Sequence, residues 1–479
     1  MNSELGHTRS KTVLYLEYLI VFILFWVYHE FSKFFIYHSH IRVQISPEAA
    51  PLFGVVVNVA PFKLRWLLSP FIAYFELLFF SLLIYKNKLS RLGSFLFALF
   101  FVELVVNVGI EFTDIWRFPI ISLHGASQYI NDVNKFNNLS DILKNYVSKM
   151  YFLTTHSGTH PPGPVILMWI VTKLFGFSHL VKIAFILLFE PFTAFYLYFL
   201  GKELYTEKVS LYAVLLYIVS PSIVMYGFAS MDAVFAVFLV GTLYYFIKSM
   251  VTVDESRWRY IAGIFFVVSS MLTFASSFLV MYFFFFTILT YFLNREYYVR
   301  SLKTFITIIL MFISVLLFLK FFFHFDYVAC LLEAMKIDAY GSLHHSGCGT
   351  GFESPERYFF ISFSNLFAFF IGMGIPGITL WFRELWSIAF GKRRVRIFEI
   401  TDVFIISFIV TLLLNAFGGL YTLETERIWM FLSPFIILPA AKNFTNYLEK
   451  VKFKAEPFLT ITLAFIQTLL LEILLYTLW

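Results

Sequence analysis

Long runs of apolar residues, separated by short polar stretches, recur along the whole chain. About 20 consecutive apolar residues let a helix cross a hydrocarbon core roughly 30 Å thick. The pattern predicts thirteen such helices, at residues 13–37, 66–85, 93–110, 182–201, 209–226, 231–250, 260–276, 277–293, 304–323, 357–381, 398–417, 427–441 and 456–478. We therefore predict an all-α, polytopic integral membrane protein with about 13 transmembrane helices and no separate soluble domain.

The composition agrees with this pattern. Of 479 residues, 60% are hydrophobic and 14% are charged, whereas soluble domains carry about 25% charged residues. The net charge of +6 comes from Lys and Arg that cluster between the apolar runs. Such clusters are typical of cytosolic loops, so the charge indicates orientation and not nucleic-acid binding. Membrane lipids are the expected surroundings, and no cleavable signal peptide precedes the first span.

The basic clusters determine a topology. They lie around residues 86–91, 202–208, 248–259, 295–303, 383–396 and 442–454. All six fall in the cytosol if residues 163–176 do not cross and residues 260–293 cross twice, turning near Ser276 and Ser277. The alternative, with 163–176 crossing and 260–293 as one span, moves two clusters outside and is disfavoured. The predicted outside segments are residues 38–65, 111–181, 324–356 and 418–426.

Polar residues gather in these outside segments. Glu111 and Asp114 lie where a span meets the outside water, and acidic groups there are either solvated or functional. The same loop contains Arg117, His124, Asp132, His156 and His160, and other outside-facing polar positions are Asp232, Glu424, Glu426 and Arg427. Asp232 is also explained as a helix cap, and Arg427 as a snorkelling side chain.

Several chemistries are open to this set. His156 and His160 have the i, i+4 spacing of a zinc pair on a helix, but the intervening Gly and the following Pro-Pro disfavour a helix. A hydrolase would need a nucleophile elbow, which is missing. A transporter would place acidic residues within its spans, as at Glu17, Glu76, Glu103, Glu190 and Glu472. Group transfer at the membrane surface needs an acid and a phosphate-binding cation, and both are present.

The two cysteines, Cys330 and Cys348, fall in the predicted outside loop 324–356. In an oxidising compartment they could form a disulfide. Two free thiols are an equally good prediction, because the sequence does not give their separation.

Three motifs carry a family resemblance. The stretch THPPGPVILMWIVTKLFGFSHLVK and the following residues up to 250 resemble GT-C membrane glycosyltransferases, in particular the dolichyl- or polyprenyl-phosphate-dependent mannosyltransferase-like branch. There, HPP opens an amphipathic helix that ends in Phe-Gly, and a later span ends in Ser-Pro before an aspartate. DIWRF at 114–118 resembles the first outside loop of the family, and ETERIWMFLSP resembles its Glu-x-x-Arg element.

The resemblance implies an inverting glycosyltransferase that moves a hexose or pentose from a polyprenyl- or dolichyl-phosphate donor to a hydroxyl of a glycan, lipid or protein. Asp114 would be the catalytic base, with Glu111 as the alternative. Further implied roles are the donor phosphate for Arg427 with His156 or His160, orientation of Arg427 for Glu426, substrate binding for Arg117, Asp132 and Asp232, and a Mg²⁺ or Mn²⁺ ion, if one is used, for Asp114 and Asp132.

Two spans precede the helix with which the family usually starts. Residues 1–90 are therefore predicted as an N-terminal two-helix extension and residues 91–479 as the GT-C domain, with a catalytic loop at 111–181 that contains short membrane-parallel helices. The active site would face away from the cytosol, at a prokaryotic plasma membrane or in the endoplasmic reticulum. The alternative function is a lipid or solute transporter without catalysis.

Overall fold

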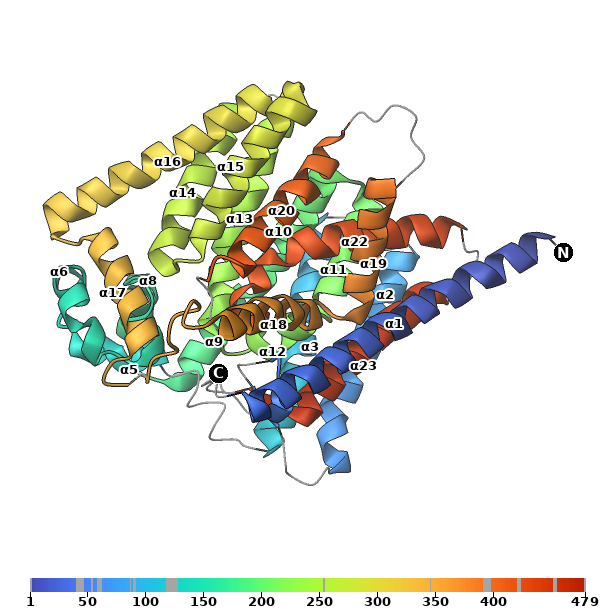
Figure 1. Ribbon diagram of the computed structural model, residues 1–479, viewed down its shortest axis with the longest axis horizontal. Coiled ribbons are helices and arrows are strands. Elements are labelled where there is room, and N and C mark those ends of the chain that lie inside the picture. Colours follow the sequence, from blue (N-terminus) through green and yellow to red (C-terminus); the bar gives the residue numbers. More distant parts are fainter. Residues whose placement is uncertain are drawn as a thin grey trace.

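The computed structural model describes residues 2–39, 47–52, 55–57, 63–86, 88, 92–117, 128–252, 255–344, 346–390, 398–419, 424–450 and 455–477. These residues form a bundle of helices that cross one another at varied angles (Figure 1). The chain is an integral, multi-pass membrane protein, because eight of the described helices are long and apolar enough to span a bilayer. The number becomes ten if each of two bent pairs is one span, so the predicted count of thirteen is not confirmed.

The N-terminal helices pack against the body of the bundle. They are α1 (Asn2–His38), α2 (Leu68–Tyr85) and α3 (Leu92–Arg117), with the 3₁₀-helices η1 (Pro47–Ala49) and η2 (Leu64–Leu67) between the first two. Helix α1 lies across α18 and α19, and Tyr28 stacks on Phe367 with ring centroids 3.7 Å apart. Helix α2 runs along α3, where Phe80 lies against Phe95.

The predicted catalytic loop folds into short helices. They are α5 (Gln128–Asp132), η3 (Val133–Lys135), α6 (Leu139–Lys149), η4 (Met150–Phe152), α7 (Thr155–Gly158) and α8 (Gly163–Phe175). Helix α8 has 13 residues and is about 20 Å long at 1.5 Å per residue, less than a hydrocarbon core. Its first residue, Gly163, lies so close to α14 that an added Cβ would be 2.2 Å from the carbonyl oxygen of Met271.

The centre of the bundle is built from eight successive helices in the described part of the chain. They are α9 (His179–Phe189), α10 (Pro191–Leu204), α11 (Glu207–Tyr217), α12 (Pro221–Gly227), α13 (Met231–Val251), α14 (Glu255–Leu272), α15 (Ser276–Leu293) and α16 (Arg295–Phe323). Of these, α9 and α10 together form one candidate span, and α11 and α12 form a pair bent by 58°. Helices α13 to α16 lie side by side (Figure 1). Helix α14 ends at Leu272 and α15 begins at Ser276, close to the turn that the sequence predicts near Ser276 and Ser277.

The last third of the chain contains the sharpest bend. Its helices are α17 (Tyr327–Tyr340), α18 (Pro355–Met373), α19 (Ile375–Phe390), α20 (Ile400–Ala416), α21 (Thr425–Ile428), η5 (Met430–Leu432), α22 (Ser433–Lys450) and α23 (Glu456–Leu474). The predicted span at 357–381 falls on the pair α18 and α19, which is bent by 109° between Met373 and Ile375. Gly374 adopts a left-handed φ of 83°, and Pro376 cannot continue the α18 hydrogen-bond ladder.

A short strand pair joins distant parts of the chain. Strand β1 (Val55–Val57) pairs antiparallel with β2 (Leu475–Thr477), in the register Val55 to Thr477. The predicted final span extends to residue 478, but α23 ends at Leu474 and the next three residues are extended.

Candidate active site

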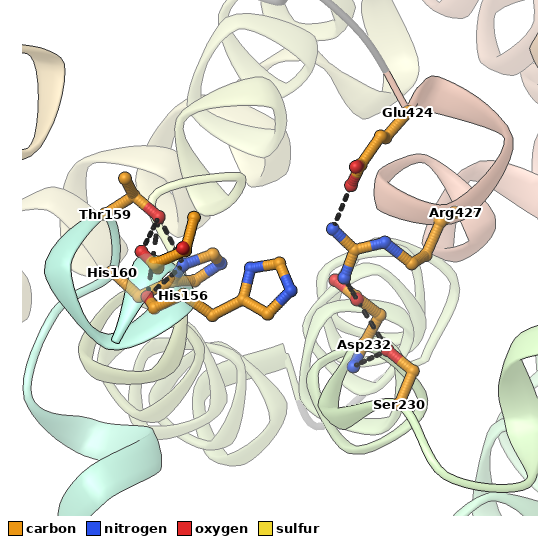
Figure 2. A network of polar contacts seen from close by, with 8 residues as sticks. His156, Thr159, His160, Ser230, Asp232, Glu424 and Arg427 are labelled. Carbon is orange, nitrogen blue, oxygen red and sulfur yellow. Dashed lines mark hydrogen bonds and ion pairs between the residues drawn. The ribbon is translucent and has the colours of Figure 1, made fainter. Parts of the chain in front are cut away.

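A buried arginine joins the start of α13 to a segment 195 residues later in the chain. Arg427, in α21, is 5% exposed. Its Nη1 lies 2.6 Å from Asp232 Oδ2, and its Nη2 lies 2.5 Å from Glu424 Oε2 (Figure 2). A buried guanidinium is stable only with such partners, because desolvation of an unpaired charge costs several kcal/mol. The ion pairs therefore hold α13 and α21 together at this point.

The N-cap of α13 is Ser230. Its Oγ accepts a hydrogen bond from the Asp232 backbone N–H at 3.2 Å and donates one to Asp232 Oδ2 at 2.7 Å. A serine oxygen that accepts from the first helical turn is a common cap. The capping role considered for Asp232 is thus filled by Ser230, and the Asp232 carboxylate points toward Arg427 (Figure 2).

Asp232 and Glu424 are carboxylates that form ion pairs with the Arg427 guanidinium in the structure. The role predicted for Glu426, to orient Arg427, stays a prediction. Glu426 is buried on the same short helix, and its backbone carbonyl accepts a hydrogen bond from Ser222. The i, i+3 spacing of Glu424 and Arg427 could have indicated this pair from the sequence.

The two histidines lie just before the first turn of α8. His156 lies in the single turn of α7, and His160 follows it, so the HSGTH stretch is not one continuous helix. His160 Nδ1 lies 2.9 Å from the backbone oxygen of His156. A carbonyl oxygen can only accept, so Nδ1 carries the hydrogen and Nε2 presents its lone pair in the neutral ring.

Aromatic rings connect the histidines with α13. Tyr129 of α5, which the sequence did not indicate, stacks on His156 with ring centroids 6.0 Å apart and meets the edge of His160 at 5.8 Å. Phe235 of α13 lies 5.7 Å from the His160 ring. Because Phe235 is about one turn from Asp232, the histidine pair faces the Asp232–Arg427 ion pair (Figure 2).

Burial changes the protonation of His160. Desolvation is the largest influence and lowers the pKa of His160 to about 4, while Asp232 raises this pKa and Arg427 lowers it. The ring is therefore neutral at pH 7. A neutral ring with its lone pair on Nε2 suits a hydroxyl group, which can donate, better than a phosphate oxygen, which can only accept.

Asp132 stabilises the predicted catalytic loop through hydrogen bonds and an ion pair. It is fully buried, and its Oδ2 accepts hydrogen bonds from Thr154 N at 3.0 Å and Thr154 Oγ1 at 2.5 Å. Lys135 Nζ lies 2.7 Å from the other oxygen. These contacts fix the start of α7 and so the position of His156. No group of three or more metal-ligating side chains occurs among the described residues. Of the two predicted Mg²⁺ or Mn²⁺ ligands, Asp114 lies outside the described side chains.

Several predicted residues lie outside the described side chains. Glu111, Asp114 and Arg117 occupy the last two turns of α3, but only their helical backbone is described. His124 falls within 118–127, outside the described residues. The base predicted for the reaction, Asp114, stays a prediction.

Cys330 and Cys348 are not joined by a disulfide in the structure, so the pairing considered from the sequence is not formed. Cys330 is buried in α17, with its Sγ 3.7 Å from Met150 Sδ. Burial raises the pKa of the Cys330 thiol to about 12. This thiol therefore joins the packing between α17 and the catalytic loop.

Comparison with known proteins supports the predicted resemblance. Residues 159–323 match the family model described as dolichyl-phosphate-mannose-protein mannosyltransferase. The Archaeoglobus fulgidus oligosaccharyltransferase is structurally similar in its apo form (TM-score 0.51, 13% identity, 79% of this chain and 56% of that chain). The same enzyme tethered to an acceptor peptide containing the NVT sequon gives a TM-score of 0.52 at 12% identity, over 79% of this chain and 55% of that chain.

A third similar structure is ArnT from Cupriavidus metallidurans bound to undecaprenyl phosphate, with a TM-score of 0.46 and 10% identity over 68% of this chain and 55% of that chain. No curated protein matches the chain in sequence. The chain spans about half the length of the solved proteins that it matches. The resemblance predicted from the sequence is confirmed, both by the mannosyltransferase family match and by the GT-C fold shared with the oligosaccharyltransferase.

Proposed function

We propose that this protein is a glycosyltransferase that moves a sugar from a dolichyl- or polyprenyl-phosphate carrier to an acceptor hydroxyl, with inversion. The observation that carries the proposal is the buried Arg427, held by two carboxylates and facing a neutral histidine. The matching family is named for dolichyl-phosphate-mannose, which supports a donor of this chemical class. The acceptor is a hydroxyl of a glycan, a lipid or a protein, at the non-cytosolic membrane face.

In the proposed reaction, Asp114 removes the proton from the acceptor hydroxyl. The acceptor oxygen bonds to the anomeric carbon of the sugar as the bond from that carbon to the phosphate oxygen breaks, and the carrier leaves as its phosphate. Arg427 binds the phosphate in exchange for Glu424, which is the more exposed of its two partners (24% against 9% for Asp232). The His160 Nε2 lone pair accepts a hydrogen bond from the acceptor and orients it.

The test is a transfer assay. The purified protein is incubated with radiolabelled polyprenyl-phosphate sugars and a mixed extract of lipids, glycans and peptides, and new glycoconjugate is measured. Asp114→Asn should lose about 10²- to 10⁴-fold in rate while it still binds donor, because general-base catalysis contributes roughly that much. Arg427→Lys should weaken donor binding, because lysine loses the planar two-point contact.

Full transfer by the Asp114→Asn variant would move the base to Glu111, and the Glu111→Gln variant is the matching control. Absence of transfer by the wild-type protein with every donor, together with movement of an unmodified lipid or solute, would favour the transporter.

One observation supports that alternative. Glu103 of α3 and Glu190, which lies between α9 and α10, are both fully buried next to one another. Asn107 Nδ2 and Tyr217 OH contact the Glu190 carboxyl at 3.3 and 3.2 Å. Buried acidic residues inside spans often mark ion or substrate pathways.

A further inference from the structure

One buried cation differs from all the others in the described part of the chain. Lys182 lies in the first turn of α9 and is 2% exposed. It is the only buried lysine among the described residues. Among the described residues, no hydrogen bond or ion pair is found for its ammonium group. The two arginines that are buried in the described part of the chain both have carboxylate partners, with Arg427 paired to Asp232 and Arg357 to Glu353.

An ammonium without a counter-charge is unfavourable in an apolar environment, since burying an unpaired ion costs several kcal/mol even after relaxation. Lys182 lies in an otherwise apolar stretch of α9, and the next residue, Ile183, forms a small buried cluster with Phe228 and Ala229. A buried lysine at this position is therefore suited to bind an anionic group of a ligand.

The position of Lys182 connects it with the candidate active site. Phe228 and Ala229, which pack on α9 at Ile183, directly precede the Ser230 cap and Asp232. Helix α9 contacts both α8, which follows His160, and α13. Lys182 therefore lies on a helix that borders the candidate site, next to the residue that packs against the segment before Ser230.

The net charge of the group around Arg427 favours a second cation near the donor phosphate. Arg427 carries one positive charge and faces two carboxylates, so this group has a net charge of −1 when all three are ionised. A donor phosphodiester brings one negative charge, and the phosphate monoester that leaves after transfer carries up to two. A second cation beside the phosphate would offset this increase.

We propose that Lys182 binds the phosphate group of the lipid-linked donor, an inference that rests on the proposed function. Its ammonium donates to a phosphate oxygen while the anomeric carbon–oxygen bond breaks and the acceptor oxygen takes its place. The proton of the acceptor goes to Asp114, and the electron pair of the broken bond stays on the phosphate, next to Lys182.

Ligand-dependent thermal stability tests this proposal. The full-length protein in lipid nanodiscs is titrated with polyprenyl phosphate, with the phosphate-free polyprenol and with inorganic phosphate. A ligand that binds only the folded state raises the unfolding temperature, and the rise increases with the logarithm of the ratio of ligand concentration to Kd. In the wild-type protein polyprenyl phosphate should raise it, and polyprenol should not. A rise with inorganic phosphate as well would show that the phosphate alone is recognised.

The Lys182→Met variant should lose about tenfold or more in affinity for polyprenyl phosphate, the typical effect of removing a hydrogen bond to a charged group. Without ligand it should unfold at the same or a higher temperature, because a buried charge is gone. Lys182→Arg should retain part of the affinity. The matched control is Lys202→Met at the other end of the same span, where the lysine is 42% exposed beside Glu207.

An unchanged ligand response in Lys182→Met, or a wild-type protein that no phosphate ligand stabilises, would overturn the inference. A lower unfolding temperature of the unliganded variant with an unchanged ligand response would assign Lys182 to the packing instead. Failure of the proposed function is distinct, because it appears as missing transfer by the wild-type protein in the radiolabel assay.

Discussion

The residues of the candidate site illustrate what a sequence can indicate about chemistry. Acidic, basic and histidine positions on the outside segments predicted a site there, and Asp232, His160 and Arg427 do lie near one another. Their partners could not be predicted, because Asp232 and Arg427 are 195 residues apart and each has an adequate local explanation. The sequence did not indicate a role for Lys182, because a lysine at the edge of an apolar run is common in membrane proteins.

His160 gives a prediction about pH. Its pKa is about 4 in the folded protein and about 6.5 in an unfolded chain, so between these values the unfolded chain binds a proton that the folded protein does not. Stability should therefore fall as pH is lowered from 6.5 toward 4. In His160→Gln this part of the pH dependence should be absent.

The measurement is the unfolding temperature in detergent at pH 4.5 to 7.5, compared between the wild-type protein and the variant. His38→Gln, which removes an exposed imidazole at the end of α1, serves as the control. An identical pH dependence in His160→Gln and the wild-type protein would contradict the assignment.

At the scale of helices, breaks and close approaches determine the shape of the site. The apolar runs predicted where helices occur, but a run does not distinguish a straight span from the right-angled pair α18–α19. The Gly374-Ile375-Pro376 sequence contains the physical reason for that bend and could have indicated it. The close approach of α8 to α14 at Gly163 could not be predicted, because it depends on a residue more than 100 positions away.

Gly163 provides the prediction at this scale. In Gly163→Ala the new Cβ would meet the backbone oxygen of Met271, and backbone cannot move aside easily. We expect a loss of about 1–3 kcal/mol in unfolding free energy, typical of overpacking, and lower transfer activity because His160 shifts with α8.

The matched control for this substitution is Gly93→Ala in α3, where nothing lies within 4 Å of the added Cβ. Its stability should stay the same or rise slightly, since alanine is the better helix former. Equal stability of the two variants would show that α8 and α14 can separate freely.

For the whole molecule, the sequence predicted a polytopic membrane protein with a GT-C fold, and both are confirmed. The number of spans was not confirmed, because hydropathy does not tell which apolar helices are complete crossings. The N-terminal helices α1 and α2 pack on the bundle, and we propose that residues 1–90 are an addition to the GT-C core. Orientation rests on the basic clusters alone.

The two cysteines make the predicted orientation testable. Cys348 is half-buried in the loop predicted to lie outside, and Cys330 is buried with a raised pKa. A membrane-impermeant maleimide should label Cys348 in sealed vesicles that expose the non-cytosolic face, and should leave Cys330 unlabelled because the thiolate is the reactive form.

The Cys348→Ser variant should abolish this labelling. If the label reached Cys348 only after the vesicles were opened, the loop would be cytosolic and the orientation reversed.

The pairing of β1 with β2 has a consequence for biosynthesis. Residues 55–57 are made more than 400 residues before their partners at 475–477. At about 5–20 residues per second, the early strand waits roughly 20–80 s for its partner to leave the ribosome. During that time its backbone amides and carbonyls need water or another partner, and the strand pair forms only after the whole bundle of helices between the two strands has been made.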